Sequence, residues 1–425
     1  MKKIAVLLLS VLLLLISLCG CQDPSGFLSD FGGQIKRTYE NISEEISGGI
    51  SAVVPSGAFA SEDVVYIYPN NEVPKNNRLS AYRKLSDKQK KLYSIMLEAV
   101  ENMELRNIEV TKYVTGDGFS DSIVAHRALL CDRPDIFWMP KTISVLSLEG
   151  RKEKYIAFKD YYGEDDQKGF YGLTVAEKEE KEVLFNAALE NALKNVGKYS
   201  TLFEKELYIH DYICENTVYD EDAANELPGA DKDSLSAYGA LVNGKAICEG
   251  YAKAFELLCI KSGIPCNVVS GIHSDVPHMW NIADLGDGVY YVDPTFDDGS
   301  SSSLIHVYFN VTKEFISADR TFDAAFSPES DYGGEADFNF FTDDCEGTAS
   351  NYYEKLGAYI DADCASAAYI ISQAIQNGKN TAEFKNITGM SPQNALEHLA
   401  HKVRKTVAIQ YCYRYDDENI IIAVW

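Results

Sequence analysis

The sequence predicts an α+β fold in which a central helix packs on an antiparallel sheet. The first observation is an apolar helical run from about Ile247 to Lys261, which Ser262-Gly263 closes before a proline. The second is a pair of strand-like segments, 278–284 and 289–293, joined by a glycine-containing turn. The third is that helix and strand patterns also occur on both sides of this region, which indicates smaller α+β modules flanking the core.

The chain begins with a segment typical of protein export. Lys2-Lys3 precedes an apolar run from Ile4 to Leu18, and small residues follow up to Cys21. The run is too short for a usual membrane-spanning helix. The pattern resembles a bacterial lipoprotein signal over residues 1–20, with Cys21 as the lipidated first residue of the mature protein. The alternative is an ordinary secretory signal in which Cys21 has no special role. We expect a lipid-anchored protein on the extracytoplasmic face of the cell membrane.

A tether and an accessory module are expected next. Residues 21–77 are rich in Gly, Ser, Asn and acids with little periodicity, so we interpret them as a tether. Residues 78–173 form the predicted N-terminal α+β module. Ser86 with Gln89 has capping-box spacing at the start of a helix, and residues 136–139 and 154–158 have the character of strands.

The central unit is predicted over residues 174–326 and a C-terminal α+β module over 327–425. Thr174 and Thr201 each precede a glutamate at capping-box spacing, which predicts two helices ahead of the central one. A glycine and four serines at 299–303 are expected to form a flexible loop. In the C-terminal module we expect a helix near 365–376, a second helix from Ser391-Pro392 and a hairpin of 407–415 against 420–425.

Three residues of complementary chemistry lie in and after the central helix. A thiol attacks a carbonyl carbon as thiolate, so it needs a base beside it and a third group that orients the base. Cys248 is in the first turn of the helix, where unpaired N–H groups favour a thiolate. If Gly286-Asp287 forms a two-residue turn, His278 and Asp293 become diagonal neighbours on one face of the hairpin, roughly 7–8 Å apart. These residues supply thiol, base and orienting acid.

These residues stand in three local motifs: Cys248-Glu249-Gly250-Tyr251-Ala252, His278-Met279-Trp280-Asn281 and Asp293-Pro294-Thr295. Over about residues 200–315 the chain therefore resembles the transglutaminase-like superfamily of papain-related thiol enzymes. The resemblance implies a papain/transglutaminase-like core. It also implies Cys248 as nucleophile, His278 as base and Asp293 as the acid that orients it.

The expected mechanism is covalent acyl transfer at a peptide or protein amide outside the cell. The Cys248 N–H would be one oxyanion donor. In relatives an aromatic or amide side chain upstream of the nucleophile supplies a second donor, which makes Tyr238 and Asn243 candidates. Trp280 is expected to wall the cleft and pack the hairpin. Protease, transamidase and deamidase chemistry all remain open, with a slight preference for hydrolysis.

Other cysteines and histidines are expected to be structural. Cys259 and Cys266 lack a helix N-terminus and are interpreted as core residues. His210 and Asp211 are adjacent on a helix and point in different directions, so we expect no dyad between them. His273 is expected in a loop at the rim of the cleft. No C-x-x-C pair and no calcium-loop spacing occur, so we expect neither metal nor cofactor.

The charge excludes one class of partner. The chain carries 39 basic and 64 acidic residues, a net charge of −25. Removal of residues 1–20 would take away two lysines and give 37 − 64 = −27. A protein this acidic is a poor ligand for nucleic acid or anionic lipid, so its membrane contact is expected to be the acyl anchor. The alternative to an enzyme is a noncatalytic surface-binding protein that retains the fold.

Overall fold

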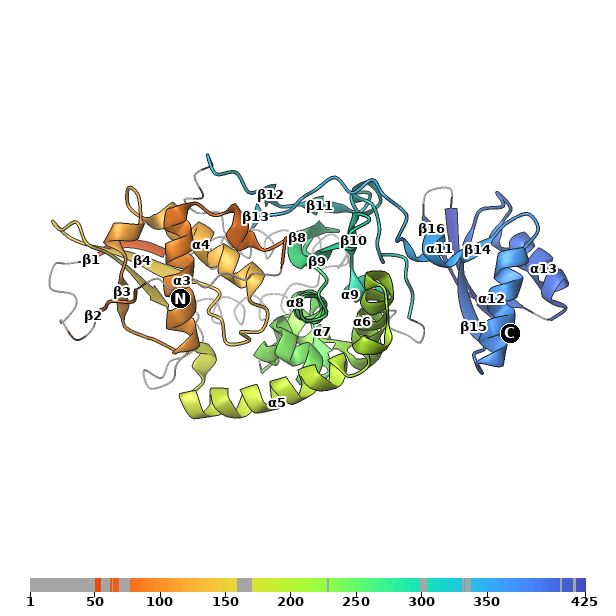
Figure 1. The fold of residues 1–425 in the computed structure, drawn as a ribbon, viewed down its shortest axis with the longest axis horizontal. Helices are drawn as coiled ribbons and strands as arrows, with labels where there is room; N and C mark the ends of the chain where they lie inside the picture. Colours follow the sequence, from red (N-terminus) through yellow and green to blue (C-terminus); the bar gives the residue numbers. More distant parts are fainter. Residues whose placement is uncertain are drawn as a thin grey trace, which may run out of the picture.

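The computed structural model describes residues 50–54, 62, 64–68, 77–158, 170–227, 229–298, 304–330, 332, 338–405, 407–415 and 418–425. The predicted signal peptide, Cys21 and the 299–303 loop lie outside these residues. The described parts are arranged along one long axis (Figure 1), with an N-terminal unit at one end, a helix-rich central unit and a C-terminal unit at the other end. No helix among them is long and apolar enough to cross a membrane.

The N-terminal unit is a five-stranded sheet covered by two helices. The strand order is β1-β4-β5-β3-β2. The bounds are β1 Ile50–Val54, β2 Val64–Val65, β3 Asn107–Glu109, β4 Ile143–Leu148, β5 Lys154–Phe158, α3 Asp87–Glu101 and α4 Phe119–Asp132. The capping box of Ser86 and Gln89 begins α3 as predicted. Because β1 pairs in parallel with β4 and β2 with β3, the expectation of a tether over 21–77 is wrong for Ile50–Val54 and Val64–Val65.

The strand expected at residues 136–139 is also wrong. These residues form turns between α4 and β4, and their apolar side chains are buried. The Trp138 indole Nε1 donates to the Val100 carbonyl at 3.0 Å, and the Phe137 and Trp138 rings meet edge to face with centroids 4.8 Å apart. A short apolar run indicates buried residues but does not distinguish a strand from a buried loop. Here residues 136–139 form a loop whose side chains fill the core.

The central unit places helices around a four-stranded antiparallel sheet of order β10-β9-β8-β11. Its main bounds are α5 Val175–Leu193, α6 Leu202–Asn216, α8 Cys248–Lys261, β8 Cys266–His273, β9 Val276–Asp284, β10 Val289–Val292 and β11 Arg320–Phe322. Both predicted capping boxes are present, at Thr174 and Thr201. The shorter elements are β6 Val218–Tyr219, α7 Glu221–Ala224, β7 Lys245–Ala246, α9 Pro294–Asp297, α10 Lys313–Ile316, β12 Ala324–Ala325 and β13 Phe338–Asn339.

The predicted register of the β9–β10 hairpin is confirmed. Leu285 N donates to Gly288 O at 3.0 Å, and the pairing runs from Val289 with Asp284 to Val292 with Asn281. The sheet stops there, because Asp293 leaves the strand and caps the short helix α9. The loop expected around His273 is instead strand, and β8 turns into β9 at Ser274 and Asp275, both with positive φ.

The N-terminal and central units share one hydrophobic core. A single cluster of buried apolar side chains extends from Leu79 to Cys345. Buried polar contacts join the units as well: Asn77 Nδ2 donates to the Cys266 carbonyl at 2.7 Å, and Asn267 Nδ2 donates to Asp132 Oδ1 at 3.4 Å. The segment 338–341 belongs to this core, although sequence analysis assigns it to the C-terminal module.

The C-terminal unit has a core of its own. Its sheet has the order β14-β15-β17-β16, and the cluster that it buries begins at Ile360. The bounds are α11 Tyr352–Leu356, β14 Tyr359–Ile360, α12 Ala365–Gln376, β15 Thr381–Asn386, α13 Pro392–Val403, β16 Ala408–Tyr415 and β17 Glu418–Val424. Both predicted helices and the predicted hairpin are confirmed.

Candidate active site

Cys248 is the first residue of α8, and Ile247 is its N-cap. The side chain is partly exposed, and it lies close enough to His278 to help raise the pKa of that imidazole. Because the first backbone N–H groups of a helix lack partners within it, they point toward the space around the thiol. The helix thus begins with a partly exposed thiol that has an imidazole beside it and backbone N–H groups near it.

Gly250 allows the first turn of α8 to pack closely against the backbone of residues 234–236. A Cβ at this position would lie 2.5 Å from the Ser234 carbonyl oxygen and 3.0 Å from that of Ser236. The same 234–236 segment holds the start of the helix, since Ile247 N donates to Ser234 O at 2.9 Å. A glycine two residues after the thiol is therefore a steric requirement of the way that α8 is seated.

His278 and Asp293 form the second part of the site. His278 Nε2 lies 2.7 Å from Asp293 Oδ2, and both side chains are buried. The other carboxylate oxygen, Oδ1, accepts from Phe296 N at 3.3 Å and so caps α9. Each oxygen of Asp293 therefore has its own partner, which fixes the direction from which the carboxylate meets the imidazole.

The electrostatics favour an ion pair. Burial opposes the charge of His278, but the attraction of Asp293 and hydrogen bonds to Asp293 and Cys248 outweigh it and raise the pKa of His278 to about 10. Burial also opposes the charge of Asp293, yet His278 and Arg320 together hold its pKa below the usual value. The imidazolium is thus the favoured form of His278 at neutral pH.

Arg320 is a site residue that sequence reasoning missed. Its Nη2 lies 2.7 Å from Asp293 Oδ2, the oxygen that also meets His278. The guanidinium is buried between aromatic rings, with Cζ 4.3 Å from the Phe296 centroid and 4.4 Å from that of Tyr308. It also pairs with Asp319. Arg320 follows Asp293 by 27 residues, and only the pairing of β11 with β8 brings it to the site.

Glu249 holds the nucleophile helix to the N-terminal unit. Its carboxylate lies 2.5 Å from Lys141 Nζ and 2.8 Å from Lys253 Nζ. Burial opposes its ionisation, but the two lysines prevail and lower its pKa to about 2. Lys141 belongs to the loop before β4, so an ion pair joins the residue beside the thiol to the accessory module.

The expected cleft residues occupy different places. Trp280 is buried and its ring stacks on that of His278 with centroids 5.8 Å apart, as expected for a residue that packs the hairpin. Tyr238 is buried against Phe137, with ring centroids 4.8 Å apart. Asn243 is exposed, and its amide donates to Asp231 Oδ2 at 2.9 Å. The described contacts of Tyr238 and Asn243 include none with the triad.

Tyr219, which the sequence analysis did not single out, lies near enough to Cys248 to interact with it electrostatically. Burial, together with the charges of Cys248, Glu221 and Asp293, raises the pKa of its hydroxyl to about 12. It is half-buried at the end of β6, and its ring centroid lies 6.5 Å from that of Tyr251. It precedes the nucleophile by 29 residues, so no local motif could have indicated its position.

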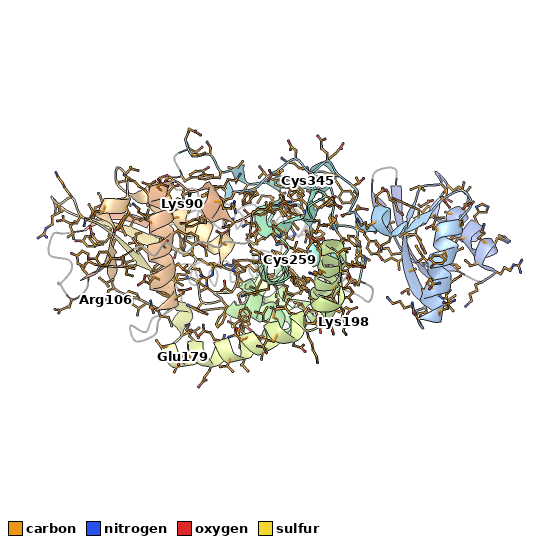
Figure 2. All side chains as sticks on the ribbon, in the orientation of Figure 1. Lys90, Arg106, Glu179, Lys198, Cys259 and Cys345 are labelled. Atoms are coloured by element: carbon orange, nitrogen blue, oxygen red, sulfur yellow. The ribbon has the colours of Figure 1, made fainter. Side chains whose placement is uncertain are left out.

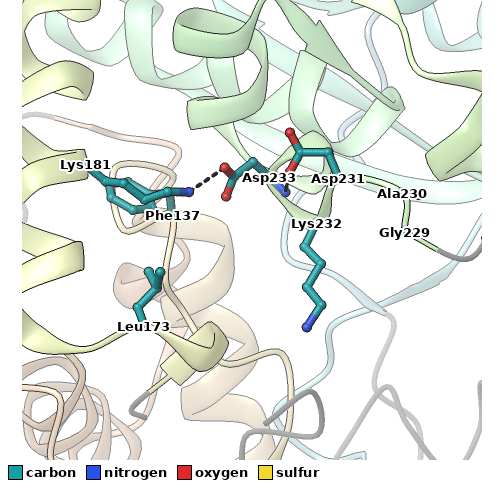
Figure 3. A pocket seen from close by; sticks show the side chains of 8 residues that line it. All are labelled: Phe137, Leu173, Lys181, Gly229, Ala230, Asp231, Lys232 and Asp233. Atoms are coloured by element: carbon teal, nitrogen blue, oxygen red, sulfur yellow. Dashed lines mark hydrogen bonds and ion pairs between the residues drawn. The ribbon is translucent and has the colours of Figure 1, made fainter.

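A cavity of about 390 Å³ opens beside the 229–233 segment rather than at the thiol. Figure 3 shows Phe137, Leu173, Lys181 and the segment from Gly229 to Asp233 around it. Two of the lining residues, Lys181 and Asp233, form a short ion pair with each other. None of Cys248, His278 and Asp293 lines this cavity, so it is separate from the candidate active site.

Two expectations about histidine need correction. His210 and Asp211 do meet, with Nδ1 3.2 Å from Oδ1, because the imidazole and the carboxylate turn toward each other over the helix surface. His210 is fully buried. His273 lies in β8, not in a loop, with its ring centroid 6.3 Å from that of His278.

Cys259 and Cys266 are buried, as expected. Figure 2 labels Cys259 within the central unit. Burial, reinforced by Cys266, raises the pKa of the Cys259 thiol well above its usual value. The seven cysteines with described side chains are all free: Cys131, Cys214, Cys248, Cys259, Cys266, Cys345 and Cys364.

Comparisons with known proteins found similarities over the central part of the chain. Residues 190–312 match the profile of the Transglutaminase-like superfamily. Kyphoscoliosis peptidase of Mus musculus is 29% identical over 116 residues, which cover 24% of this chain and 17% of that protein. The Homo sapiens protein of the same name is 27% identical over 116 residues, with the same coverage. The match thus spans less than a fifth of the length of these curated relatives.

Two solved structures are also similar. One is a protein from Cytophaga hutchinsonii described as a cysteine protease, 22% identical, covering 26% of this chain and 37% of that chain with a TM-score of 0.22. The other is a TGase, 18% identical, covering 55% of this chain and 60% of that chain with a TM-score of 0.28.

Proposed function

We propose, from the transglutaminase-like domain that residues 190–312 form, that this protein is a thiol enzyme acting on peptide or protein amides through an acyl thioester on Cys248. The main support for this proposal is the arrangement of Cys248, His278 and Asp293 at the site. Cys248 at a helix N-terminus interacts with His278 and helps raise the pKa of its imidazole, and His278 Nε2 lies 2.7 Å from a buried Asp293. These contacts support the roles of nucleophile for Cys248, base for His278 and orienting acid for Asp293.

The reaction begins at the carbonyl carbon of the amide. The Cys248 sulfur adds to that carbon after its proton has passed to His278, and the carbonyl oxygen becomes an oxyanion. The backbone N–H of Cys248 is one donor to this oxyanion. As the C–N bond breaks, the imidazolium gives its proton to the leaving nitrogen and the amine departs. The acyl group remains on sulfur as a thioester.

A second nucleophile then completes the reaction. His278 removes a proton from water or from a primary amine, which attacks the thioester and releases the thiolate. Water yields a carboxylic acid, and an amine yields a new amide. Only the shape and dryness of the cleft choose between them. We propose hydrolysis of peptide amides as the main outcome, which the acidic composition and partly exposed thiol support.

Asp293 holds the imidazole in the orientation that this reaction needs. Its carboxylate is itself held from two sides, by Phe296 N and by Arg320. His278 and the guanidinium keep the pKa of Asp293 below its usual value, so its charge can favour the imidazolium that forms during attack. Neither Asp293 nor Arg320 exchanges a proton with the substrate.

The experiment is product analysis by mass spectrometry. Purified protein is incubated with a glutamine-containing peptide and an excess of primary amine. Cleaved peptide backbone would establish a protease, conversion of glutamine to glutamate a deamidase, and amine incorporation a transamidase. Each product must disappear in Cys248→Ala and persist in the matched control Cys364→Ala. If no product depends on Cys248 for any of a panel of peptides and proteins, the proposal fails and a noncatalytic binding role replaces it.

We also propose that the enzyme works on the extracytoplasmic face of the membrane, held by a lipid on Cys21. The support is the sequence alone: two lysines, the apolar run from Ile4 to Leu18 and the small residues before Cys21. Cys21→Ser should then move the protein from the membrane fraction to the soluble fraction. Unchanged fractionation would refute the lipid anchor.

A further inference from the structure

A second polar cluster lies beside the candidate active site and is not used by its chemistry. His210 and Asp211 come from α6, and His306 comes from the segment after α9. One donor atom of each of the three side chains lies within 4.8 Å of the others. The set consists of two imidazoles and a carboxylate, which are common ligands of zinc and related cations.

The distances within the cluster suit a small coordination sphere. Asp211 Oδ1 lies 3.2 Å from His210 Nδ1 and 3.0 Å from His306 Nε2. In a tetrahedral zinc site with bonds of about 2.0 Å, neighbouring donor atoms are roughly 3.3 Å apart. The three side chains therefore already have the spacing from the carboxylate oxygen that such a site requires.

The other nitrogen of each imidazole meets a further carboxylate. His210 Nε2 lies 3.1 Å from Asp297 Oδ2, and His306 Nδ1 lies 3.0 Å from Glu383 Oε2. Metal-binding histidines almost always have such a partner, which fixes the tautomer and the ring orientation. This arrangement would leave His210 Nδ1 and His306 Nε2 free to bind a cation.

The orienting residues are themselves held in place. Asp297 Oδ1 accepts from Tyr308 N at 2.9 Å. Glu383 accepts from His306 N at 3.2 Å and from the Tyr353 hydroxyl. The His306 ring also stacks on Tyr352, with centroids 3.9 Å apart and planes 3° from parallel. Both rings are thus fixed before any ligand arrives, as a preorganised site requires.

The charge of the cluster and its exposure to solvent also suit a bound cation. Three carboxylates, those of Asp211, Asp297 and Glu383, face two imidazoles in a largely buried place. Either two protons on the imidazoles or one divalent cation can offset this excess of negative charge. The Asp211 side chain is 34% exposed, so solvent and an ion can reach the cluster from its side.

We propose that His210, Asp211 and His306 bind one divalent cation of the zinc class, with water as a fourth ligand and with Asp297 and Glu383 orienting the imidazoles. Glu383 belongs to β15 of the C-terminal unit, whereas Asp297 ends the α9 helix that Asp293 begins. The bound ion would therefore join the C-terminal unit to the element that carries the orienting acid. The site is independent of the proposed amide chemistry.

Calorimetric titration of ZnCl₂ into chelator-treated protein tests this proposal. The Cys248→Ala background removes the reactive thiol as a competing ligand. We expect one ion per chain. His306→Gln should weaken zinc binding by at least about 100-fold. Glu383→Gln, which changes the residue that orients His306, should weaken it by about 10–100-fold. The exposed histidine His401 on α13 provides the matched control, and His401→Gln should bind as the parent does.

Cobalt substitution identifies the ligands without relying on variants that could fail to fold. Co²⁺ bound by nitrogen and oxygen should give only weak visible bands. An intense thiolate-to-cobalt band would show that a cysteine binds the metal, and this result would overturn the assignment. The cysteine in question would be Cys214, whose Sγ lies 4.0 Å from His210 Nε2. Absence of 1:1 binding in the folded parent, or equal affinity in folded His306→Gln, would also overturn the assignment and leave a buried ion-pair network.

Discussion

Arg320 and His278 meet the same carboxylate oxygen, Asp293 Oδ2, each at 2.7 Å. The guanidinium keeps its charge at any pH that the protein meets, so it holds Asp293 ionised whether or not His278 is protonated. The aromatic rings of Phe296 and Tyr308 around it exclude water and keep this interaction strong. Arg320 is thus a positioning residue that acts through Asp293.

Arg320→Gln tests this role. Loss of the cation leaves a buried carboxylate with one fewer partner, so we expect the free energy of unfolding to fall by about 3–5 kcal/mol. The pKa of Asp293 should rise, which moves the acid limb of the activity profile to higher pH. Urea unfolding and a pH profile of turnover measure the two effects. The exposed Arg83 serves as control. A destabilised variant with an unmoved acid limb would reduce Arg320 to a packing role.

The charge of His278 also predicts how stability depends on pH. Its pKa of about 10 in the folded protein exceeds the unfolded value of about 6.5. Because the folded value is the higher one, the contribution is fully present below about pH 6.5 and is lost as pH rises toward 10. Asp293→Asn removes the main attraction, so the wild-type advantage in unfolding free energy should shrink between pH 6 and pH 10. An advantage that stays constant over that range would contradict the ion pair.

At the scale of elements, the parts that local patterns specify were predictable. Local sequence patterns predicted α8, the β9–β10 register and the C-terminal helices. These patterns are helix caps, apolar periodicity and a two-residue turn, all of which involve residues close together in the chain. The run at 136–139 and the part of the expected tether that forms β1 were predicted incorrectly. In both cases long-range packing decided the outcome: a buried loop looks like a strand, and β1 is stabilised by pairing with β4, 94 residues further on at Ser144.

Gly250 offers a test of how α8 is seated. Gly250→Ala places a Cβ against the backbone carbonyls of Ser234 and Ser236, and backbone cannot move aside as a flexible side chain can. We expect a loss of about 1–3 kcal/mol in stability and a slower reaction of Cys248 with alkylating agents. Gly197→Ala is the matched control, since a Cβ there meets nothing within 4 Å. Wild-type stability and reactivity in Gly250→Ala would show that the contact is unimportant.

At the scale of the whole molecule, units that are separate in sequence are joined in packing. The core that α8 packs into includes side chains of the N-terminal unit and of the 338–341 segment. Sequence boundaries at 173 and 326 could not reveal this, because periodicity shows which residues are buried but not against which partner. The same limit hid Arg320 and the contact between His306 and Glu383, whose residues lie 77 positions apart.

A fragment experiment follows from this shared core. Residues 174–326 alone would expose the apolar surface that the N-terminal unit covers, so we expect a fragment that aggregates or unfolds without cooperativity. Residues 50–357 retain that core and should unfold in one cooperative transition. Circular dichroism during urea unfolding measures both. Cooperative unfolding of the shorter fragment with undiminished stability would show that the central unit is an independent domain.

The reactivity of Cys248 is the sharpest test of whether Cys248, His278 and Asp293 act as a triad. Brief exposure of the native protein to iodoacetamide near neutral pH, followed by peptide mass spectrometry, reports the labelling rate of each cysteine. We expect Cys248 to react first and Asp293→Asn to lower its rate by orders of magnitude, while the exposed control Asp222→Asn leaves it unchanged. Labelling of Cys248 no faster than that of the buried cysteines, or equal rates in wild type and Asp293→Asn, would contradict the assignment of this triad.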